Sequence, residues 1–291
     1  MSVRKKDRVK VNSQLKEVWR CFKKNKAAMV GLTVFVLILL ITVFADLIVT
    51  YSKAIDTNRQ DLLLPPGAEY LFGTDNLGRD YFARIIHGSR ASISVAMIVS
   101  VASLLISSVL GGIAGYYGGR VDNIMMRILD VFMCIPQILL ALAVVSALGS
   151  TLINLCIALT ISSIPGNVRL IRSTIINVSE NDYIEAAKSY GASDLRIIMK
   201  YIIPNAVGPI IVNTTIGMAN MILSAASLSF LGMGVQPPTP EWGSMLSFAK
   251  DFMRTQPWLI YIPGVCIVLT ALSVNLIGDG LRDALDPKVR S

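Results

Sequence analysis

The sequence lacks charge over five long stretches. Of its 291 residues only 16% are charged and 53% are hydrophobic. Apolar runs of about 18 residues or more are what a hydrocarbon layer about 30 Å thick requires of a spanning helix. This distribution argues against an ordinary soluble domain. The charge-free runs occupy residues 27–45, 91–119, 131–168, 201–240 and 255–278.

The same runs lack alternation of polar and apolar residues. A membrane β-barrel shows a period of two along each strand. Backbone groups inside lipid cannot be hydrated, so a span that is not part of a barrel must be helical. The sequence therefore predicts an all-α, multi-pass membrane protein.

Catalytic and cofactor motifs are also absent. The chain contains no H-E-x-x-H, G-x-S-x-G or G-x-x-x-x-G-K-[ST] pattern. Its four cysteines have no metal-ligand spacing, and the single histidine, His87, is a poor candidate for a metal site. We therefore expect no enzyme activity, no ATP-binding loop, and no cofactor or metal bound by this chain. The spans also lack the buried charges that proton-coupled carriers use, which argues against an ATP-independent secondary transporter.

Glycine and proline divide the apolar runs into six predicted spans. The 131–168 run is too long for one helix, and a turn at Gly149-Ser150 splits it. Pro204 and Pro209 limit the next span at its start. The predicted spans are 28–50, 92–115, the two halves of 131–168, 207–231 and 257–278.

Positive charge predicts the orientation. Ten of the 27 Lys and Arg residues lie in the first 26 positions, and the apolar run that follows is too long for a cleaved signal peptide. Six spans place 20 of the 27 on the side of both termini, which is then cytoplasmic. Nucleic-acid binding would require a folded basic domain, and the sequence contains none. The predicted organisation is a basic cytoplasmic segment 1–26, a first transmembrane helix 27–50, an external segment 51–90 with an interfacial helix, a core 91–278 containing a cytoplasmic loop 169–204, and a cytoplasmic tail 279–291.

The cytoplasmic loop 169–204 is longer than two neighbouring helices need. Asp182 and Glu185 have the spacing of a capping box, Lys188 falls in the last turn, and Gly191 ends a helix of about two turns. Ser193 or Asp194 then begins a second short helix with an apolar face of Leu195, Ile198, Met199 and Ile202, ending near Pro204. Such a pair either docks in a groove of another protein or lies on the membrane surface.

This loop resembles the EAA loop of permease subunits of ABC importers. Glu185-Ala186-Ala187, then Gly191, then Ile202-Ile203-Pro204 carry the resemblance, with Tyr201 and Ile203 where the pattern usually has Ile and Leu. In that family the loop forms a coupling helix that docks in a groove of a separate ATPase subunit. The resemblance implies coupling roles for Tyr183, Glu185, Ala186, Ala187, Gly191, Asp194, Leu195, Ile198 and Pro204.

Three further stretches, 71–80, 230–243 and 278–287, resemble the C-type permease subunit of dipeptide, oligopeptide and nickel importers. The resemblance implies a type I ABC importer permease fold, alternating access and a prokaryotic cytoplasmic membrane. Its implied partners are a second, non-identical permease subunit, two ATP-binding subunits that carry ATP and Mg²⁺, an external substrate-binding protein and membrane lipid. The expected cargo is a di- or oligopeptide, with nickel complexes, glutathione or another small polar solute as alternatives.

Polar residues recur on one face of the fifth predicted span. They are either packing contacts between helices or the lining of a hydrated path. We expect packing for Gly217 and Ser227; the candidate path residues are Asn213, Asn220 and Ser224. A similar stripe in the second span is expected to pack, and it consists of Ser100, Ser103, Ser107, Gly111 and Ala114.

Asp80 is expected to cap a short helix at the outer membrane surface. That helix would set the entry angle of the second span, with Arg79, Arg84 and Arg90 at the level of the lipid headgroups. Alternatively, Asp75 and Asp80 help to dock the external binding protein. Further along, Trp242 and Trp258 suit an interfacial belt.

Overall fold

The computed structural model describes residues 16–285, so most of the predicted basic N-terminal segment and residues 286–291 of the predicted tail lie outside the described residues. Most of the described residues are helical, beginning with residues 16–24. Further helices follow after Asn25. They are α2 (Lys26–Val43), α3 (Ala45–Ile48), α4 (Tyr51–Ile55), α5 (Tyr81–Tyr117), α6 (Gly119–Met133), α7 (Gln137–Leu148), α8 (Leu152–Ser179), α9 (Asp182–Ser189), α10 (Asp194–Ile197), the π-helix η1 (Ile198–Ile202), α11 (Ile203–Phe230), α12 (Trp242–Ala249), the 3₁₀ helix η2 (Lys250–Phe252) and α13 (Trp258–Leu285).

Within residues 16–285, five helices are long and apolar enough to cross a membrane: α2, α5, α8, the continuous Asp194–Phe230 helix and α13. A sixth span exists only if α6 and α7 are counted together, and these two helices are bent by 82° relative to each other. The span predicted in the first half of 131–168 is present only as this bent pair, in which α7 begins at Gln137. Pro136 stands at the bend, where it cannot continue the hydrogen bonding of a helix. The predicted turn at Gly149 is confirmed, with a φ of 92°.

Several predicted boundaries differ from the structure. The short helix after Asp80 is not separate, because α5 continues without a break through the second span. Residues 119–130, which lie between two predicted spans and were expected to be loop, belong to the amphipathic helix α6. Pro204 does not end a helix: the chain continues from the π-helix η1 into α11, with Pro204 as the second residue of α11.

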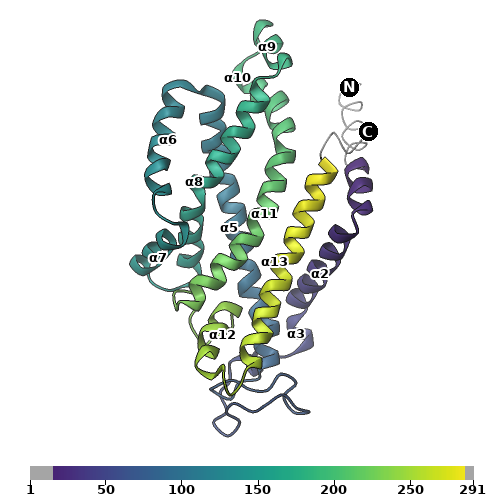
Figure 1. Cartoon of the computed structure of the whole chain (residues 1–291), viewed down its shortest axis with the longest axis vertical. Coiled ribbons are helices and arrows are strands. Elements are labelled where there is room, and N and C mark those ends of the chain that lie inside the picture. The colour runs from purple at the N-terminus through teal and green to yellow at the C-terminus, as the bar shows by residue number, and fades with distance from the viewer. Residues whose placement is uncertain (1–15, 286–291) are drawn as a thin grey trace.

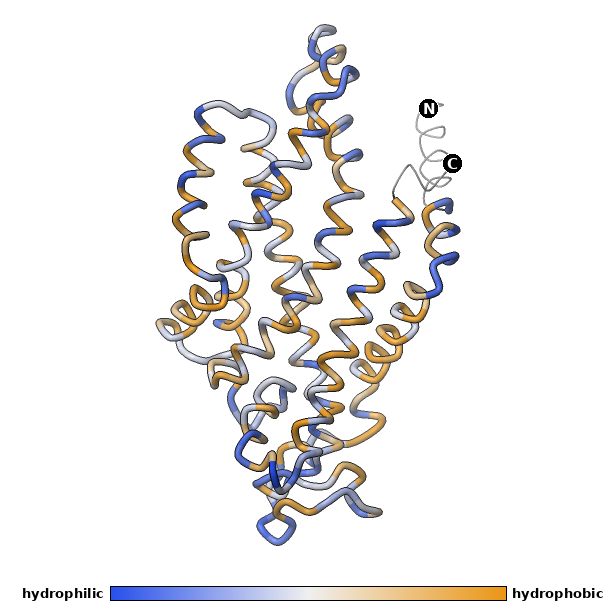
Figure 2. Tube along the Cα trace, viewed as in Figure 1, coloured by the Kyte–Doolittle hydropathy of each residue, from blue (hydrophilic) through white to orange (hydrophobic). Residues whose placement is uncertain are grey.

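The helices form an elongated bundle with two different ends (Figure 1). The start of α2, the end of α13 and the α9–α10 pair lie at one end, while α12 and the connection between α4 and α5 lie at the other. Hydrophobic residues dominate the middle of the bundle, and hydrophilic residues gather at the ends (Figure 2). This pattern is what a membrane-spanning bundle requires.

Small residues bring α5 and α8 into close contact. A Cβ atom added at Gly111 would lie 2.8 Å from the carbonyl oxygen of Val168, and one at Gly115 would lie 2.9 Å from that of Arg172. Ser103 also accepts hydrogen bonds from the Ser163 hydroxyl and the Asn167 amide, at 2.9 and 2.7 Å. The predicted packing role of the stripe in the second span is therefore confirmed for its Ser103 and Gly111 positions.

We expect Gly111→Ala to destabilise the protein by about 1–3 kcal/mol, because the added methyl group would overlap backbone atoms of α8. Gly112→Ala is the matched control, since a Cβ there meets nothing within 4 Å. The control substitution should be neutral or stabilising, because alanine is the better helix former. Thermal unfolding of the detergent-solubilised protein measures both, and equal stabilities would contradict the close packing.

Candidate functional site

The α9–α10 pair, which we call the head, projects beyond the bundle (Figure 1). Asn181 precedes α9, and its side-chain amide donates to the carbonyl oxygens of Asn177 and Val178 at the end of α8. The predicted capping box is wrong: Asp182 is the first residue of α9, and no side-chain cap bond forms. Asp182 and Glu185 instead lie in the first turn, where acidic groups interact favourably with the helix dipole.

Gly191 ends the first head helix as predicted. Its φ of 72° lies in the left-handed region, which glycine adopts without steric cost. Lys188 lies in the last turn of α9, also as predicted, and Ser193 precedes α10. The head is therefore helix, glycine turn and helix.

The inner side of the head is anchored in an apolar cluster. Ile184 of α9 is fully buried and Ile197 of α10 is 1% exposed. They join Ile171 and Ile175 of α8, together with Ile202 of η1, in one cluster of buried side chains. The head thus rests on a packed base formed by the two long helices that flank it in the chain.

The outer side of the head carries most of the residues assigned to coupling. Leu195 is 73% exposed and Tyr183 is 43% exposed. Ala187 and Ile198 are the exceptions, because both are partly buried against the apolar cluster. The other exposed members of the predicted set are Glu185, Ala186, Gly191, Asp194 and Pro204.

Two aromatic residues extend the predicted site. Tyr190, directly before Gly191, is 91% exposed. Tyr116, near the end of α5, donates a hydrogen bond of 2.7 Å to Asp194, and the Lys188 ammonium lies 5.7 Å from the centre of its ring. The position of Tyr190 directly before the predicted turn at Gly191 is a sequence signal that could have identified it. Tyr116 had no sequence signal, because its contacts come from a different helix.

A small cavity with both polar and apolar lining lies between α5, α8 and α11. Its volume is about 40 Å³, and Ser100, Ser163 and Asn167 line it together with Asn213 and Gly217. Asn213 also donates from its side-chain amide to the Pro209 carbonyl oxygen at 2.9 Å. Asn220 and Ser224 are not part of this lining, with Asn220 exposed and Ser224 half-buried. The structure therefore brings Asn213, but not the other two candidate path residues, to the cavity.

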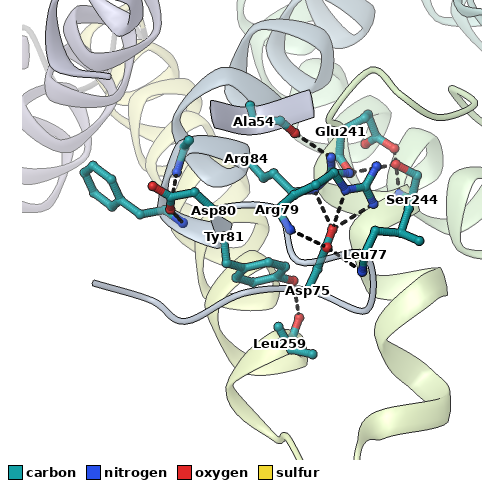
Figure 3. Close-up of polar contacts among 12 residues, drawn as sticks. Ala54, Asp75, Leu77, Arg79, Asp80, Tyr81, Arg84, Glu241, Ser244 and Leu259 are labelled. Atoms are coloured by element: carbon teal, nitrogen blue, oxygen red, sulfur yellow. Dashed lines mark hydrogen bonds and ion pairs between the residues drawn. The ribbon is translucent and has the colours of Figure 1, made fainter. Parts of the chain in front are cut away.

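Ion pairs organise the opposite end of the bundle (Figure 3). Arg79 and Arg84 are 3% and 2% exposed, so they do not lie among lipid headgroups as predicted. Arg79 forms a salt bridge of 2.7 Å with Asp75, and Arg84 lies 3.3 Å from the same carboxylate. Arg84 also donates to the Ala54 carbonyl oxygen at 2.8 Å. Asp80 caps α5 through the N–H groups of Phe82 and Ala83, as predicted.

Glu241 fixes α12 to α5 at the same end. Its buried carboxylate accepts hydrogen bonds of 2.8 Å from the backbone N–H groups of Gly243 and Ser244, and one of 3.1 Å from the Ser92 hydroxyl. Burial raises the pKa of Glu241, while these donors lower it and only partly offset the burial. Trp242 is 3% exposed and donates to the Ile85 carbonyl oxygen, so its predicted place in an interfacial belt is wrong. The Asp75, Asp80 and Glu241 carboxylates are thus engaged internally.

Within residues 16–285, no group of three or more histidine, cysteine, aspartate or glutamate side chains has the arrangement of a metal site.

An apolar helical bundle with a protruding head is the architecture of a multi-pass membrane protein, and a family comparison identifies its class. Residues 107–291 match the family described as "binding-protein-dependent transport system inner membrane component". The chain belongs to this family. Residues 13–66 match the N-terminal transmembrane domain of oligopeptide transport permease C. The predicted resemblance to C-type permeases is therefore confirmed.

Curated relatives match along almost the whole chain. The dipeptide transport system permease protein DppC of Alkalihalophilus pseudofirmus is 46% identical over 96% of this chain and 91% of its own length. DppC of Haemophilus influenzae is 44% identical, covering 95% of each protein. The glutathione transport system permease protein GsiD of Escherichia coli is 41% identical over 94% of this chain and 90% of its own length.

Solved structures show the same fold. A chain of the inward-facing MetNI methionine ABC transporter aligns with a TM-score of 0.59 at 16% identity, covering 70% of this chain and 97% of that one. A chain of an amino acid ABC transporter with histidines aligns with a TM-score of 0.57 at 15% identity, covering 68% and 92%. The predicted type I ABC importer permease fold is confirmed.

Proposed function

We propose that this chain is the permease subunit through which short peptides cross a prokaryotic cytoplasmic membrane. It works with a second, non-identical permease subunit, two ATPase subunits that carry ATP and Mg²⁺, and an external binding protein. The observation that carries this function is the head, an exposed helical pair on a packed base at the end of the continuous apolar helices. The relatives named as dipeptide permeases support a peptide as cargo.

The proposed mechanism is alternating access driven from the head. ATP binding draws the two ATPase subunits together, the docked head moves with them, and the bundle opens outward to receive cargo. Hydrolysis and product release restore the inward-facing state. Glu185 makes a polar contact in the ATPase groove, Leu195 provides an apolar anchor, and Gly191 allows close approach. Ile198 contributes from the base, because it is partly buried.

Cargo passes between the two permease subunits along a path to which α11 contributes. Asn213 contacts the passing solute at the cavity, and Asn220 and Ser224 extend the polar surface along the same helix. The amide and hydroxyl groups around the cavity are uncharged, which suits a peptide backbone better than a metal ion. Nickel complexes remain an alternative on the sequence resemblance alone. Glutathione is the better-supported second cargo, because a GsiD permease is among the relatives.

The orientation proposed here places the head in the cytoplasm. The start of α2 and the end of α13 lie at the same end as the head, which agrees with cytoplasmic termini (Figure 1). The chain itself hydrolyses no ATP in this scheme, because the nucleotide sites belong to the partner subunits.

We expect Leu195→Asp to release the ATPase subunits from the purified importer, because a carboxylate would be forced into an apolar contact. Retention of these subunits should fall about tenfold or more, as expected for the loss of a central interface anchor. Leu71→Asp is the matched control, since Leu71 is 60% exposed at the opposite end of the molecule. Co-purification on a tag carried by this chain measures both variants.

Reconstituted uptake separates the two classes of transporter. In proteoliposomes, a labelled dipeptide should enter only when the binding protein, the ATPase subunits and ATP are all present. Uptake by the permease subunits alone would instead establish an ATP-independent carrier. Equal retention of the ATPase subunits by both leucine variants would exclude the head as the docking site.

A further inference from the structure

Helix α6 is attached to the bundle in an unusual way. Its main contacts are with α5 and α8. Only Asp122 and Leu129 among its residues are buried. Its apolar residues Ile124 and Ile128 are 63% and 55% exposed. Apolar burial within this chain therefore contributes little to holding α6 in place, and its charged contacts with α8 must supply much of the attachment.

Two ion pairs join α6 to α8, and they differ in burial. Both oxygens of the Asp122 carboxylate accept hydrogen bonds from the guanidinium of Arg172, in a two-pronged arrangement. These side chains are 12% and 27% exposed. Asp130 and Arg169 form the second pair, with side chains 54% and 47% exposed. A bidentate, partly buried pair fixes geometry, whereas an exposed single contact contributes little.

Arg172 stands at the meeting point of three helices. Its carbonyl oxygen lies against Gly115 of α5, so the α8 backbone is closely packed there. Its side chain reaches α6. On the same helix, Ile171 and Ile175 belong to the cluster that anchors the head residue Ile184. A displacement of the head is therefore applied to α8 within one turn of Arg172.

We propose that the Asp122–Arg172 pair is the positioning link that makes α6 follow α8 when the head moves. Through α6 the displacement reaches the bend at Pro136 and helix α7, so the bent α6–α7 pair shifts together with α5 and α8. This inference rests on the proposed coupling function of the head. It adds two positioning residues that touch neither cargo nor the ATPase subunits.

The test measures movement of the head and of α6 separately, in the complete importer in lipid nanodiscs. The free cysteines Cys21, Cys134, Cys156 and Cys266 are first replaced. Spin labels are then placed at Ser189 of α9 or Ile128 of α6, each paired with a label at Val268 of α13, which is 58% exposed. We expect ATP to change both distances. In Asp122→Asn the change between α9 and α13 should persist, and the change between α6 and α13 should be lost.

Transport supplies the second readout. Dipeptide uptake per ATP hydrolysed should fall at least about fivefold in Asp122→Asn, and the charge swap Asp122→Arg with Arg172→Asp should recover much of it. Asp130→Asn is the matched control and should stay within about twofold of the parent.

Each outcome is decisive. If the α9 label does not respond to ATP, the coupling function fails and this inference fails with it. If α9 responds but α6 moves equally with and without the Asp122 carboxylate, the inference alone is overturned. An equal loss of uptake in Asp122→Asn and Asp130→Asn would also overturn it, because the exposed pair cannot act as the link.

Discussion

Replacing Asp75 with alanine is expected to be the most destabilising of these substitutions, at about 3–5 kcal/mol. The carboxylate is the shared partner of Arg79 and Arg84, whose side chains are 3% and 2% exposed. It also accepts hydrogen bonds from the backbone N–H groups of Leu77 and Arg79, at 2.9 and 3.1 Å. Its removal leaves two buried positive charges side by side with no acid between them.

Thermal unfolding of the solubilised protein and its level in membranes measure this loss. Asp46→Ala is the matched control, since Asp46 pairs with Arg90 at 2.9 Å but these side chains are 62% and 39% exposed. An exposed pair is worth about 0–1 kcal/mol, so the control should fold at nearly the parent level. Equal stability losses in the two variants would show that burial does not decide the role of Asp75.

The arginines at this end show where sequence reasoning fails. Arg79 and Arg84 lie between a turn-rich segment and an apolar span, which is also the pattern of residues at lipid headgroups. The sequence does not reveal that the chain before α5 folds back and places Ala54 and Asp75 beside these guanidinium groups. The capping role of Asp80 was predictable, because its donors are only two and three residues away.

The fold, too, has parts that the sequence predicts and parts that it does not. The long spans follow from composition, since lipid excludes charge over the whole length of a helix. The bent α6–α7 pair does not, because α6 contains charged residues and resembles a loop until its pairing with α8 is known. The predicted end of a helix near Pro204 was wrong because the chain continues from the π-helix η1 through Pro204 into α11, and a local π-helix can accommodate a proline.

Within the head, the sequence identified the two helices and the turn at Gly191, which depend on neighbouring residues. Its exposed and buried sides were only partly predicted. Ile198 was expected to be an outward anchor, but it packs against the base beneath it. The contact between Tyr116 and Asp194 joins residues far apart in the chain, so no local pattern indicates it.

Replacing Gly191 with valine is expected to abolish uptake while membrane insertion remains intact. At a φ of 72° any L-residue is strained, and a β-branched residue most of all. Relief of that strain requires the turn between α9 and α10 to change, which would reorient Glu185 relative to Leu195. The ATPase subunits should then hydrolyse ATP without moving cargo. Uptake of a labelled dipeptide and ATP hydrolysis, measured on the same proteoliposomes, test this separation, and wild-type uptake would remove Gly191 from the coupling site.

Two further substitutions at Gly191 separate the effect of backbone strain from the effect of side-chain size. A Cβ at Gly191 meets nothing within 4 Å, so in the isolated chain the cost is one of backbone conformation. Asparagine is larger than alanine but tolerates the left-handed region better. If the turn alone matters, Gly191→Asn should retain more uptake than Gly191→Ala. If the ATPase groove instead approaches Gly191 too closely for any side chain, the order reverses, because the larger residue then does more harm. Gly264→Ala in α13, which also meets no neighbour, should leave uptake unchanged in either case.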